Sequence, residues 1–310
     1  MEGNNNPDDH HASSYHVSVL FYETIDALQV KPEGVYVDCT FGGGGHSRGI
    51  LNRLGPDGKL IAFDQDADAI KNIPKDDRVV FIPNNFRHLQ RCLRLHGLAT
   101  VDVVLADLGV SSHQVDEGKR GFSTRFEGPL DMRMDQRQEN TASAILKKYT
   151  EQQLHKLFEQ YGEVTNSKTL AKQIVQQRNS SPLQTISQLK ALISPVVKGN
   201  PNKYLAQVFQ ALRIEVNNEM GALKEVLEQI PAVLSPGGRA VIITFHSLED
   251  RLVKNFFKNG SFDEQDENPG STEERKNDVK VITKKPITTS ADEVRRNSRS
   301  RSAKLRVAEK

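Results

Sequence analysis

Hydrophobic residues in the first third of the chain fall into short β-branched runs that alternate with stretches of helical periodicity. Four such runs lie at 35–41, 59–66, 79–86 and 101–108. This alternation is typical of βαβ units around a buried parallel sheet. Because such a sheet binds ligands at the carboxyl ends of its strands, the residues that end each run are the first candidates for a functional site.

Purely helical periodicity replaces this alternation after Leu108. Thr150 and Thr185 are each followed three residues later by a glutamine, a spacing that predicts capping boxes at the starts of two helices. A longer helix is predicted from about Leu205 to Ile230, with Pro231 closing it. The apolar positions of all these helices are interpreted as core.

The strand pattern returns at 239–247, after a Ser-Pro-Gly-Gly turn, and the alternation at 304–310 predicts a final strand. This order favours an α/β fold whose doubly wound sheet is interrupted by a helical insertion, rather than two consecutive domains. The predicted division is a flexible lead-in at 1–15, a core at 16–114 and 205–310, a helical insertion at 115–204, and a mobile acidic loop within the core at 259–278.

Composition narrows the class of protein. The 310 residues carry a net charge of +2 and contain only two cysteines, Cys39 and Cys92. Two thiols provide neither a disulfide framework nor a cysteine-built zinc site, and no metal centre is expected. No run approaches the ~18 apolar residues of a membrane span, and residues 1–16 lack the apolar core of a signal peptide. A cytoplasmic protein that does not enter a membrane is therefore predicted.

The near-zero net charge is a cancellation between segments. Residues 259–278 hold seven acids against two bases, whereas 295–310 hold seven Lys+Arg and one Glu. Local basic edges are compatible with a nucleic-acid substrate even though the total charge does not indicate one.

Four consecutive glycines, Gly42 to Gly45, follow the first predicted strand and precede a short helix predicted near Ser47 to Leu54. Glycines at a strand-to-helix turn let the backbone approach a ligand where a Cβ would clash. Asp64 ends the next strand about 20 residues on, where a carboxylate can accept hydrogen bonds from both hydroxyls of a ribose.

The glycines do not satisfy the dinucleotide pattern G-x-G-x-x-G, because Ser47 or Arg48 occupies the third glycine position. S-adenosylmethionine has a ribose but no pyrophosphate, so it needs a ribose acid and close backbone approach without a phosphate cradle. Phe86, at the end of the third strand, is placed to lie against the adenine. Asp107, at the end of the fourth, is placed near the methionine end and the methyl group. The alternatives are Phe86 as core and Asp107 as a helix cap.

Motifs along almost the whole chain resemble the ribosomal RNA small-subunit methyltransferase H family. The matching segments are VDCTFGGGGHS (37–47), IAFDQDADAI (61–70), DLGVSSHQVD (107–116), RGFS (120–123), GPLDMRMD (128–135), YGE (161–163), FQALRIEVNNE (209–219), FHSLEDR (245–251) and NSRSRSAKLRV (297–307). Ser18 and His113 stand where this family usually has proline, and Gln207 stands where it commonly has arginine.

This resemblance implies a Rossmann-like class I methyltransferase core with a helical insertion for substrate recognition. It also implies a reaction, the transfer of a methyl group from S-adenosylmethionine to the N4 amine of a cytidine in the decoding region of 16S rRNA. The expected partner is 16S rRNA within the small ribosomal subunit. The implied cofactor contacts are Gly44, Gly45, His46, Asp64, Phe86, Asp107 and Gln114.

Asp107 is the leading candidate for a catalytic residue. The N4 lone pair of cytosine is delocalised into the ring, and an acceptor for its N–H groups helps to localise that pair toward the methyl group. His246, beyond the strand at 239–245, is a weaker candidate for contact with the target base, with a buried helix cap as its alternative. No Pro-Cys pair is present, which argues against methylation at carbon 5 through a thiolate adduct.

Arg120, Asp131 and Arg133 are candidates for RNA binding because they lie in the basic leading edge of the insertion. For Asp131 and Arg133 within DMRMD, structural ion pairing is an equally good interpretation. A target inside folded RNA must be single-stranded or flipped outward before its amine can reach the methyl donor.

Two other classes of protein stay open. A non-catalytic RNA-binding or ribosome-assembly factor would keep the cofactor fold only as a scaffold, and a nicotinamide dehydrogenase is a distant third. The oligomeric state, including a homodimer, is not decided by the sequence.

Overall fold

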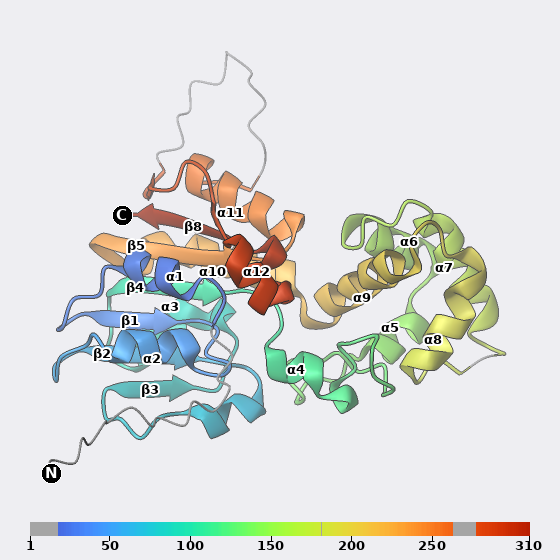
Figure 1. Ribbon diagram of the computed structural model, residues 1–310, viewed down its shortest axis with the longest axis horizontal. Helices are drawn as coiled ribbons and strands as arrows, with labels where there is room; N and C mark the ends of the chain where they lie inside the picture. Colours follow the sequence, from blue (N-terminus) through green and yellow to red (C-terminus); the bar gives the residue numbers. More distant parts are fainter. Residues whose placement is uncertain (1–17, 181, 263–276) are drawn as a thin grey trace, which may run out of the picture.

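A mixed eight-stranded sheet organises the core of the protein (Figure 1). The computed structural model describes residues 18–180, 182–262 and 277–310. The strands are β1 (Val35–Asp38), β2 (Lys59–Phe63), β3 (Val79–Ile82), β4 (Val101–Asp107), β5 (Leu234–Thr244), β6 (Lys280–Val281), β7 (Ile287–Thr288) and β8 (Lys304–Glu309). Their order is β3-β2-β1-β4-β5-β8-β6, with β7 also pairing with β8. Strands β1 to β5 pair in parallel, and β8 runs antiparallel to β5.

Helices cover both faces of this sheet, as the apolar character of the parallel strands requires. One face packs against α3 (Leu89–Leu95), α10 (Glu219–Val233) and α11 (Ser247–Asn259). The opposite face packs against α1 (Phe21–Leu28) and α2 (Gly45–Leu51). The four predicted strands, the final strand and the doubly wound α/β fold are therefore confirmed.

Short elements at the ends of strands shape the region above the sheet. They are η1 (Ala67–Asn72), η2 (Phe86–His88), α4 (Ser112–Asp116), η3 (Gly118–Arg120), α12 (Ala291–Arg296) and η5 (Ser298–Ser302). Three predicted boundaries were wrong. β3 ends at Ile82, so Phe86 begins η2; α2 begins at Gly45; and β5 already begins at Leu234 and ends before Phe245.

A second unit, built from helices, lies beside the sheet (Figure 1). Its elements are α5 (Ala142–Lys148), α6 (Glu151–Gln160), α7 (Ser167–Gln177), α8 (Ile186–Ile193), η4 (Ser194–Val196) and α9 (Pro201–Asn217). Both predicted capping boxes are present, at Thr150 with Gln153 and at Thr185 with Gln188. This unit has a hydrophobic cluster of its own, which runs from Leu130 to Val216.

The predicted single helix from Leu205 to Ile230 is two helices. Asn218 adopts a left-handed conformation (φ 47°, ψ 45°) that ends α9 and begins α10. Pro231 does not close the second helix, since α10 continues to Val233. The break has a tertiary cause, because the neighbouring Asn217 side chain bonds the backbone at Met132 and Met134.

The break also bears on where the insertion ends. Tyr204, Val208, Phe209 and Leu212 of α9 belong to the hydrophobic cluster of the helical unit, whereas α10 packs against the sheet. We therefore propose that the helical unit extends to Asn218 instead of ending at 204.

Two predicted segments fall partly or wholly outside the described residues. These are the lead-in at 1–15 and most of the acidic loop at 259–278, of which 263–276 is not described. Within the described ranges, no helix combines the length and the apolar character needed to cross a bilayer.

Substitutions at Asn218 test the left-handed break. A Cβ without a polar group opposes this conformation, so Asn218→Ala is expected to unfold more readily than Asn218→Gly, by about 1 kcal/mol. Urea denaturation of both variants measures the difference. Glu228, exposed within α10, is the matched control, because there alanine is expected to be the more stable of the two by about 1 kcal/mol. The same order at both positions would contradict the role of the backbone at Asn218.

Candidate cofactor and substrate site

A cavity of about 1110 Å³ lies at the carboxyl ends of the parallel strands. Its wall is formed by the turns after β1, β2 and β4, by the start of α10, and by Met134 from the helical unit. Single-ligand pockets usually measure about 300–1,000 Å³, so this space suits a cofactor together with part of a substrate. Of the predicted cofactor contacts, it brings together Gly45, His46, Asp64, Phe86, Asp107 and Gln114.

Two of the four glycines in the turn after β1, Gly44 and Gly45, have neighbours that a Cβ would meet at short distance. A Cβ on Gly45 would lie 1.9 Å from Ser18 Oγ, and Gly44 has a φ of 73°. Gly44 is not on the cavity wall, and it instead provides the left-handed residue before α2. Its predicted cofactor contact stays a prediction, and the structure shows a conformational role.

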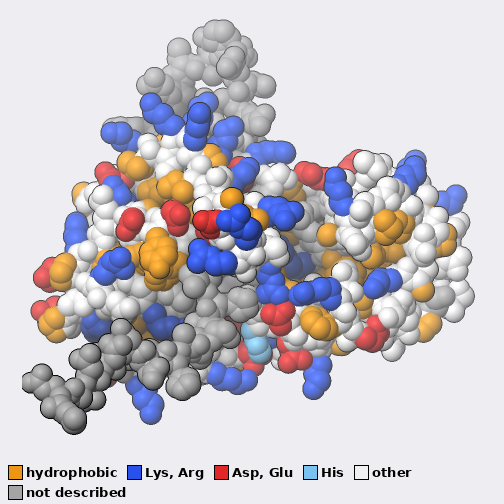
Figure 2. Space-filling model, viewed as in Figure 1, with side chains coloured by type: hydrophobic (Ala, Val, Ile, Leu, Met, Phe, Trp, Pro, Cys, Tyr) orange, Lys and Arg blue, Asp and Glu red, His pale blue; other side chains and the backbone are white. Residues whose placement is uncertain are grey.

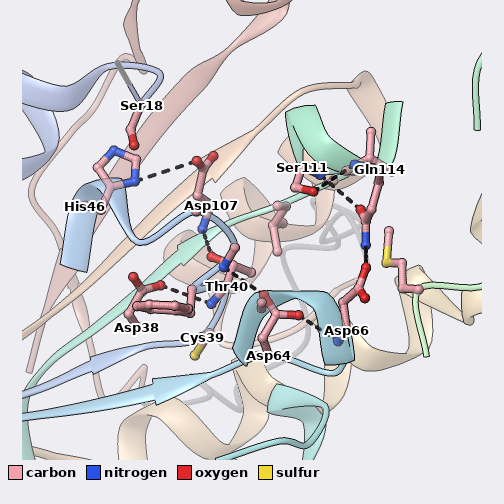
Figure 3. A pocket seen from close by; sticks show the side chains of 18 of the residues that line it. Ser18, Asp38, Cys39, Thr40, His46, Asp64, Asp66, Asp107, Ser111 and Gln114 are labelled. Atoms are coloured by element: carbon pink, nitrogen blue, oxygen red, sulfur yellow. Dashed lines mark hydrogen bonds and ion pairs between the residues drawn. The ribbon is translucent and has the colours of Figure 1, made fainter. Parts of the chain in front are cut away.

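Asp64 directly follows β2 and faces the glycine turn (Figure 3). Its Oδ2 accepts a hydrogen bond from Gly42 N at 2.7 Å, and its Oδ1 accepts one from Asp66 N at 2.8 Å. Burial raises the pKa of Asp64 to about 6, and the carboxylates of Asp66 and Asp38 contribute to the rise. Each oxygen keeps acceptor capacity, which suits recognition of a pair of ribose hydroxyls.

Asp107 ends β4 and lies opposite His46 across the cavity floor (Figure 3). His46 Nδ1 is 3.6 Å from Asp107 Oδ2, while Asp107 Oδ1 is buried and has no hydrogen-bond partner. Burial, followed by the charges of Asp38 and Glu249, raises the pKa of Asp107 well above its ordinary value. Asp107 is thus a mostly buried acid on the cavity wall, and one of its oxygens has no hydrogen-bond partner.

Phe86 and Gln114 line the cavity and also contact other parts of the protein. Phe86 lines the cavity and also packs against the sheet cluster. Gln114 forms a capping box with Ser111 at the start of α4, and its Nε2 donates to Asp66 Oδ2 at 2.7 Å. Its side chain thereby links the turn after β4 to the turn after β2.

Arg120 is buried in an ion-pair network instead of facing solvent. Its guanidinium lies 2.8 Å from Asp66 Oδ2 and 3.0 Å from Asp68 Oδ2, and it donates to the carbonyls of Arg133 and Met134. It is 6% exposed, which does not suit the predicted contact with RNA phosphates. The network was missed because it joins residues far apart in the sequence, although the alternating acids Asp64, Asp66 and Asp68 were a signal.

Asp131 and Arg133 pair with each other, at 2.7 Å. Arg133 also donates to the carbonyls of Gln136 and Gln138. These contacts favour the structural interpretation of the DMRMD segment, and RNA contact by either residue stays a prediction.

His246 is the cap of a helix. Its Nδ1 accepts from Glu249 N at 3.4 Å, and Glu249 Oε2 accepts from His246 N at 3.4 Å, so the two residues form a capping box at the start of α11. His246 therefore has the helix-capping role that the sequence analysis gave as its alternative.

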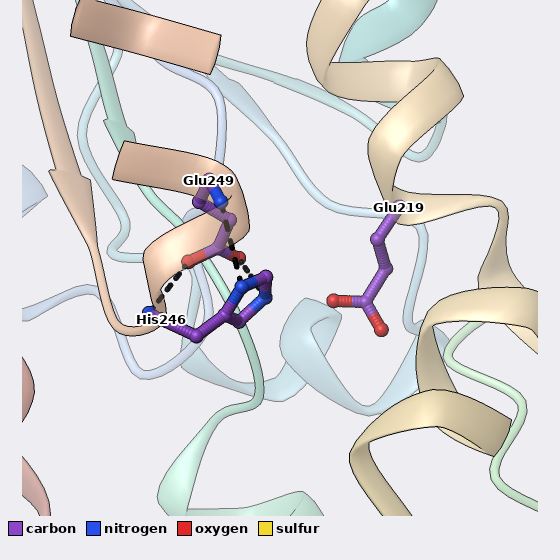
Figure 4. Close-up of side chains that lie close together, drawn as sticks. All are labelled: Glu219, His246 and Glu249. Carbon is purple, nitrogen blue, oxygen red and sulfur yellow. Dashed lines mark hydrogen bonds and ion pairs between the residues drawn. The ribbon is translucent and has the colours of Figure 1, made fainter. Parts of the chain in front are cut away.

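His246, Glu249 and Glu219 also bring three potential metal-ligand atoms within 4.8 Å of one another (Figure 4). Two observations oppose a metal site there. Because His246 Nδ1 accepts a hydrogen bond, the proton of the neutral ring is on Nε2, the nitrogen that faces the cluster. Arg213 binds both oxygens of Glu219, at 2.8 and 2.9 Å. These contacts suit a capped helix held by an ion pair better than a cation.

Lys and Arg side chains gather near the junction of the sheet and the helical unit on the face shown in Figure 2. Arg299 of η5 lines the cavity and pairs with Asp116 of α4 at 2.6 Å. Arg125 of the insertion pairs with the same carboxylate at 3.3 Å. The segment before β8 reaches this place because β8 is antiparallel to β5, so its start lies beside the carboxyl end of β5.

The doubly wound sheet, the glycine turn and the acids that end β2 and β4 define a methyltransferase with a Rossmann-like core. Residues 13–310 match the MraW methylase family, and the chain belongs to that family. The resemblance found in the sequence is confirmed.

Curated relatives agree with this assignment. The chain is 51% identical over 300 residues to a protein of Christiangramia forsetii, covering 96% of this chain and 98% of the relative. It is 51% identical over 302 residues to a protein of Cytophaga hutchinsonii, covering 96% and 99%. Both relatives are named ribosomal RNA small subunit methyltransferase H. An rRNA methylase structure from Streptococcus thermophilus, with a TM-score of 0.41 and 12% identity over 95% of this chain and 98% of that one, adds nothing to the assignment.

The raised pKa of Asp64 predicts a pH-dependent affinity for S-adenosylhomocysteine. Protonation of Asp64 removes acceptor capacity from its carboxylate, so affinity is expected to fall toward tenfold per pH unit below about pH 6. Calorimetric titrations between pH 7.5 and 5 measure the fall. Asp64→Asn should bind weakly with a flat profile, whereas Asp107→Asn, the control, should keep the fall. A steep profile in Asp64→Asn would contradict the assignment.

Proposed function

We propose that this protein transfers a methyl group from S-adenosylmethionine to the N4 amine of a specific cytidine in the decoding region of 16S rRNA, acting on the small ribosomal subunit in the cytoplasm. Membership of the MraW methylase family and the names of its relatives support an rRNA substrate. The observation that carries the proposal is one cavity that brings together Asp64, the glycine turn after β1 and the partly exposed Asp107 at the end of β4.

The residues present fit S-adenosylmethionine, which supplies an activated methyl group as a sulfonium. Asp64 would hold the ribose, Phe86 would lie against the adenine, and the backbone of the glycine turn would lie along the methionine part. Asp107 lies on the same wall with an acceptor atom that no protein group uses. The Asp107 side chain is 24% exposed, so part of it is within reach of a molecule in the cavity.

Asp107 would accept an N–H of the target amine and so orient its lone pair. Methyl transfer is an in-line displacement, and most of its acceleration comes from holding the reacting atoms about 3–3.5 Å apart and aligned. The backbone N–H of Asp107 donates to Thr40 Oγ1 at 2.7 Å, which fixes the end of β4 against the turn after β1. The acceptor is therefore held by two neighbouring strands.

The cysteines favour transfer to an amine over transfer to carbon 5. Cys39 lines the cavity, but burial and the neighbouring charge of Asp38 raise the pKa of its thiol well above the ordinary value. Carbon-5 methylation needs a thiolate nucleophile, whereas the raised pKa keeps the Cys39 thiol protonated.

Methyl transfer to small subunits that lack the modification tests the function. Purified protein with labelled S-adenosylmethionine is expected to form N4-methylcytidine at one site, detected by mass mapping of digested 16S rRNA. Asp107→Asn should lower kcat by about 10² to 10⁴ and still bind S-adenosylhomocysteine. The competing function is a non-catalytic assembly factor; particle binding and cofactor binding without any methylated cytidine would establish it and refute the enzyme.

Arg299 at the cavity mouth is expected to contact an RNA phosphate. Arg299→Gln should raise KM for the particle several-fold and reduce the slope of log affinity against log salt by about 1. Arg295→Gln is the matched control. Arg295 is 76% exposed, pairs with Asp292 within α12, and does not line the cavity. Equal effects of the two substitutions would contradict a specific contact by Arg299.

A further inference from the structure

Phe245 is the aromatic side chain of the cavity wall that lies at the end of β5. The other aromatic residues of the wall, within the described part of the chain, are Phe21 and Tyr22 of α1, Phe41 after β1, and Phe86 of η2. Phe245 is half-buried, so part of its ring is within reach of a molecule in the cavity.

The pairing of β4 with β5 places this ring beside Asp107. In the parallel register Asp107 lies opposite Ile243, and Leu108 N donates to the carbonyl of Ile243 at 3.0 Å. Side chains two positions apart along a strand share a face of the sheet. Leu105 and Ile243 belong to one hydrophobic cluster, and Phe245 packs against the same cluster. Asp107 and Phe245 therefore project from the same face of neighbouring strands.

A glycine opposite Phe245 leaves the ring uncovered on the cavity side. Gly109 lines the cavity with a φ of 94°, and a Cβ there would lie 3.7 Å from Phe245 Cδ2. A larger side chain at this position would thus extend over the ring. The absence of one keeps a flat apolar surface open next to Asp107.

The backbone at Phe245 is held by the first turn of α11. Phe245 N donates to Glu249 Oε2 at 2.8 Å, and Glu249 is fixed in turn by its capping box with His246. Part of the ring packs against the cluster that contains Ile243. These contacts fix the ring before any ligand binds, which lowers the entropy cost of binding against it.

The order of the strands separates Phe245 from the ribose acid. Along the sheet the order is β2-β1-β4-β5, so Asp64 and Phe245 follow strands on opposite sides of Asp107. The cavity of about 1110 Å³ exceeds the usual size of a single-ligand pocket. Phe245 therefore borders the part of the cavity beyond Asp107, where space is left for a second molecule.

We propose that Phe245 is a substrate-binding residue that stacks against the ring of the target cytosine and holds its exocyclic amine toward Asp107. The proposal rests on the proposed function and names the contact that binds the base. Proteins commonly hold unstacked RNA bases on aromatic side chains. Stacking does not distinguish one base from another, because every base has a π-face. In this arrangement Phe245 holds the ring, and Asp107 contacts the amine at its edge.

Phe245→Leu removes the aromatic face and keeps an apolar side chain. We expect kcat/KM for small subunits that lack the modification to fall roughly 5- to 150-fold, as the loss of one base–aromatic stack implies. Phe245→Tyr keeps the ring and should stay within about threefold of wild type. Affinity for S-adenosylhomocysteine, measured by calorimetry, should be unchanged in both. Equal losses in the two variants, or a loss of cofactor affinity that accounts for the decrease, would refute the stacking contact.

Phe262→Leu is the matched control for packing. Phe262 is also half-buried and packs against a hydrophobic cluster, but it does not line the cavity. Its kcat/KM is expected to equal that of wild type at a similar decrease in melting temperature. A decrease in kcat/KM as large as that of Phe245→Leu would assign the effect to lost stability and overturn the proposal.

Fluorescence detects the contact without any methyl transfer. The chain contains no tryptophan, so Phe245→Trp adds its single indole. Titration with cytidine in the presence of S-adenosylhomocysteine is expected to quench the emission saturably, whereas Phe262→Trp should show no saturable change. No saturable quenching in Phe245→Trp, or equal quenching in both variants, would refute the contact. If cytidine quenches as expected but wild-type protein methylates no RNA, the proposed function fails and the stacking contact stands.

Discussion

The buried ion pair between Arg120 and Asp66 is the contact on which the arrangement of the site depends. Arg120 comes from the start of the insertion and Asp66 from the turn after β2, so the pair joins the two units directly beneath the cavity. Its remaining donors bind carbonyls of the DMRMD segment. Removing one partner of such a pair leaves an uncompensated buried charge, which typically costs about 3–5 kcal/mol. The geometry of the cavity is therefore inseparable from this contact.

Several acids share the carboxyl edge of the sheet, and their partners give them different properties. Asp64 is held by two backbone N–H groups and keeps acceptor capacity, whereas Asp66 is neutralised by Arg120. Asp107 has neither a cation nor a backbone donor, and burial raises the pKa of its carboxyl well above the ordinary value. Hydrogen bonds and ion pairs thus give similar side chains different protonation behaviour and different acceptor capacity.

The sequence alone predicted those elements whose structure depends on interactions between residues close together in the chain. The β-branched runs, the capping boxes and the acids at the ends of β2 and β4 follow from short-range patterns, and they were predicted correctly. The break at Asn218 was not, because the sequence through it is compatible with a helix and the break depends on contacts of Asn217 with a distant segment.

Side-chain roles were less predictable than strands. Arg120 is a residue type that often contacts RNA, but here it is buried. Only its ion pair with Asp66, 54 positions earlier in the sequence, shows that its role is structural. His46 was identified through the glycine motif, but the tautomer of its ring depends on the carbonyl of Val19. Contacts of this kind depend on the whole fold.

The position of the helical unit between β4 and β5 also affects how the chain can assemble. These strands pair side by side, although the whole unit separates Asp107 from Leu234 in the sequence. Closing a long loop costs entropy that grows with the logarithm of its length. The helical unit has its own hydrophobic cluster, and Asn217 binds Met132 and Met134, so its two ends lie together once it has folded. In the folded unit the ends of the two strands are close together, so its folding lowers the entropy cost of pairing β4 with β5.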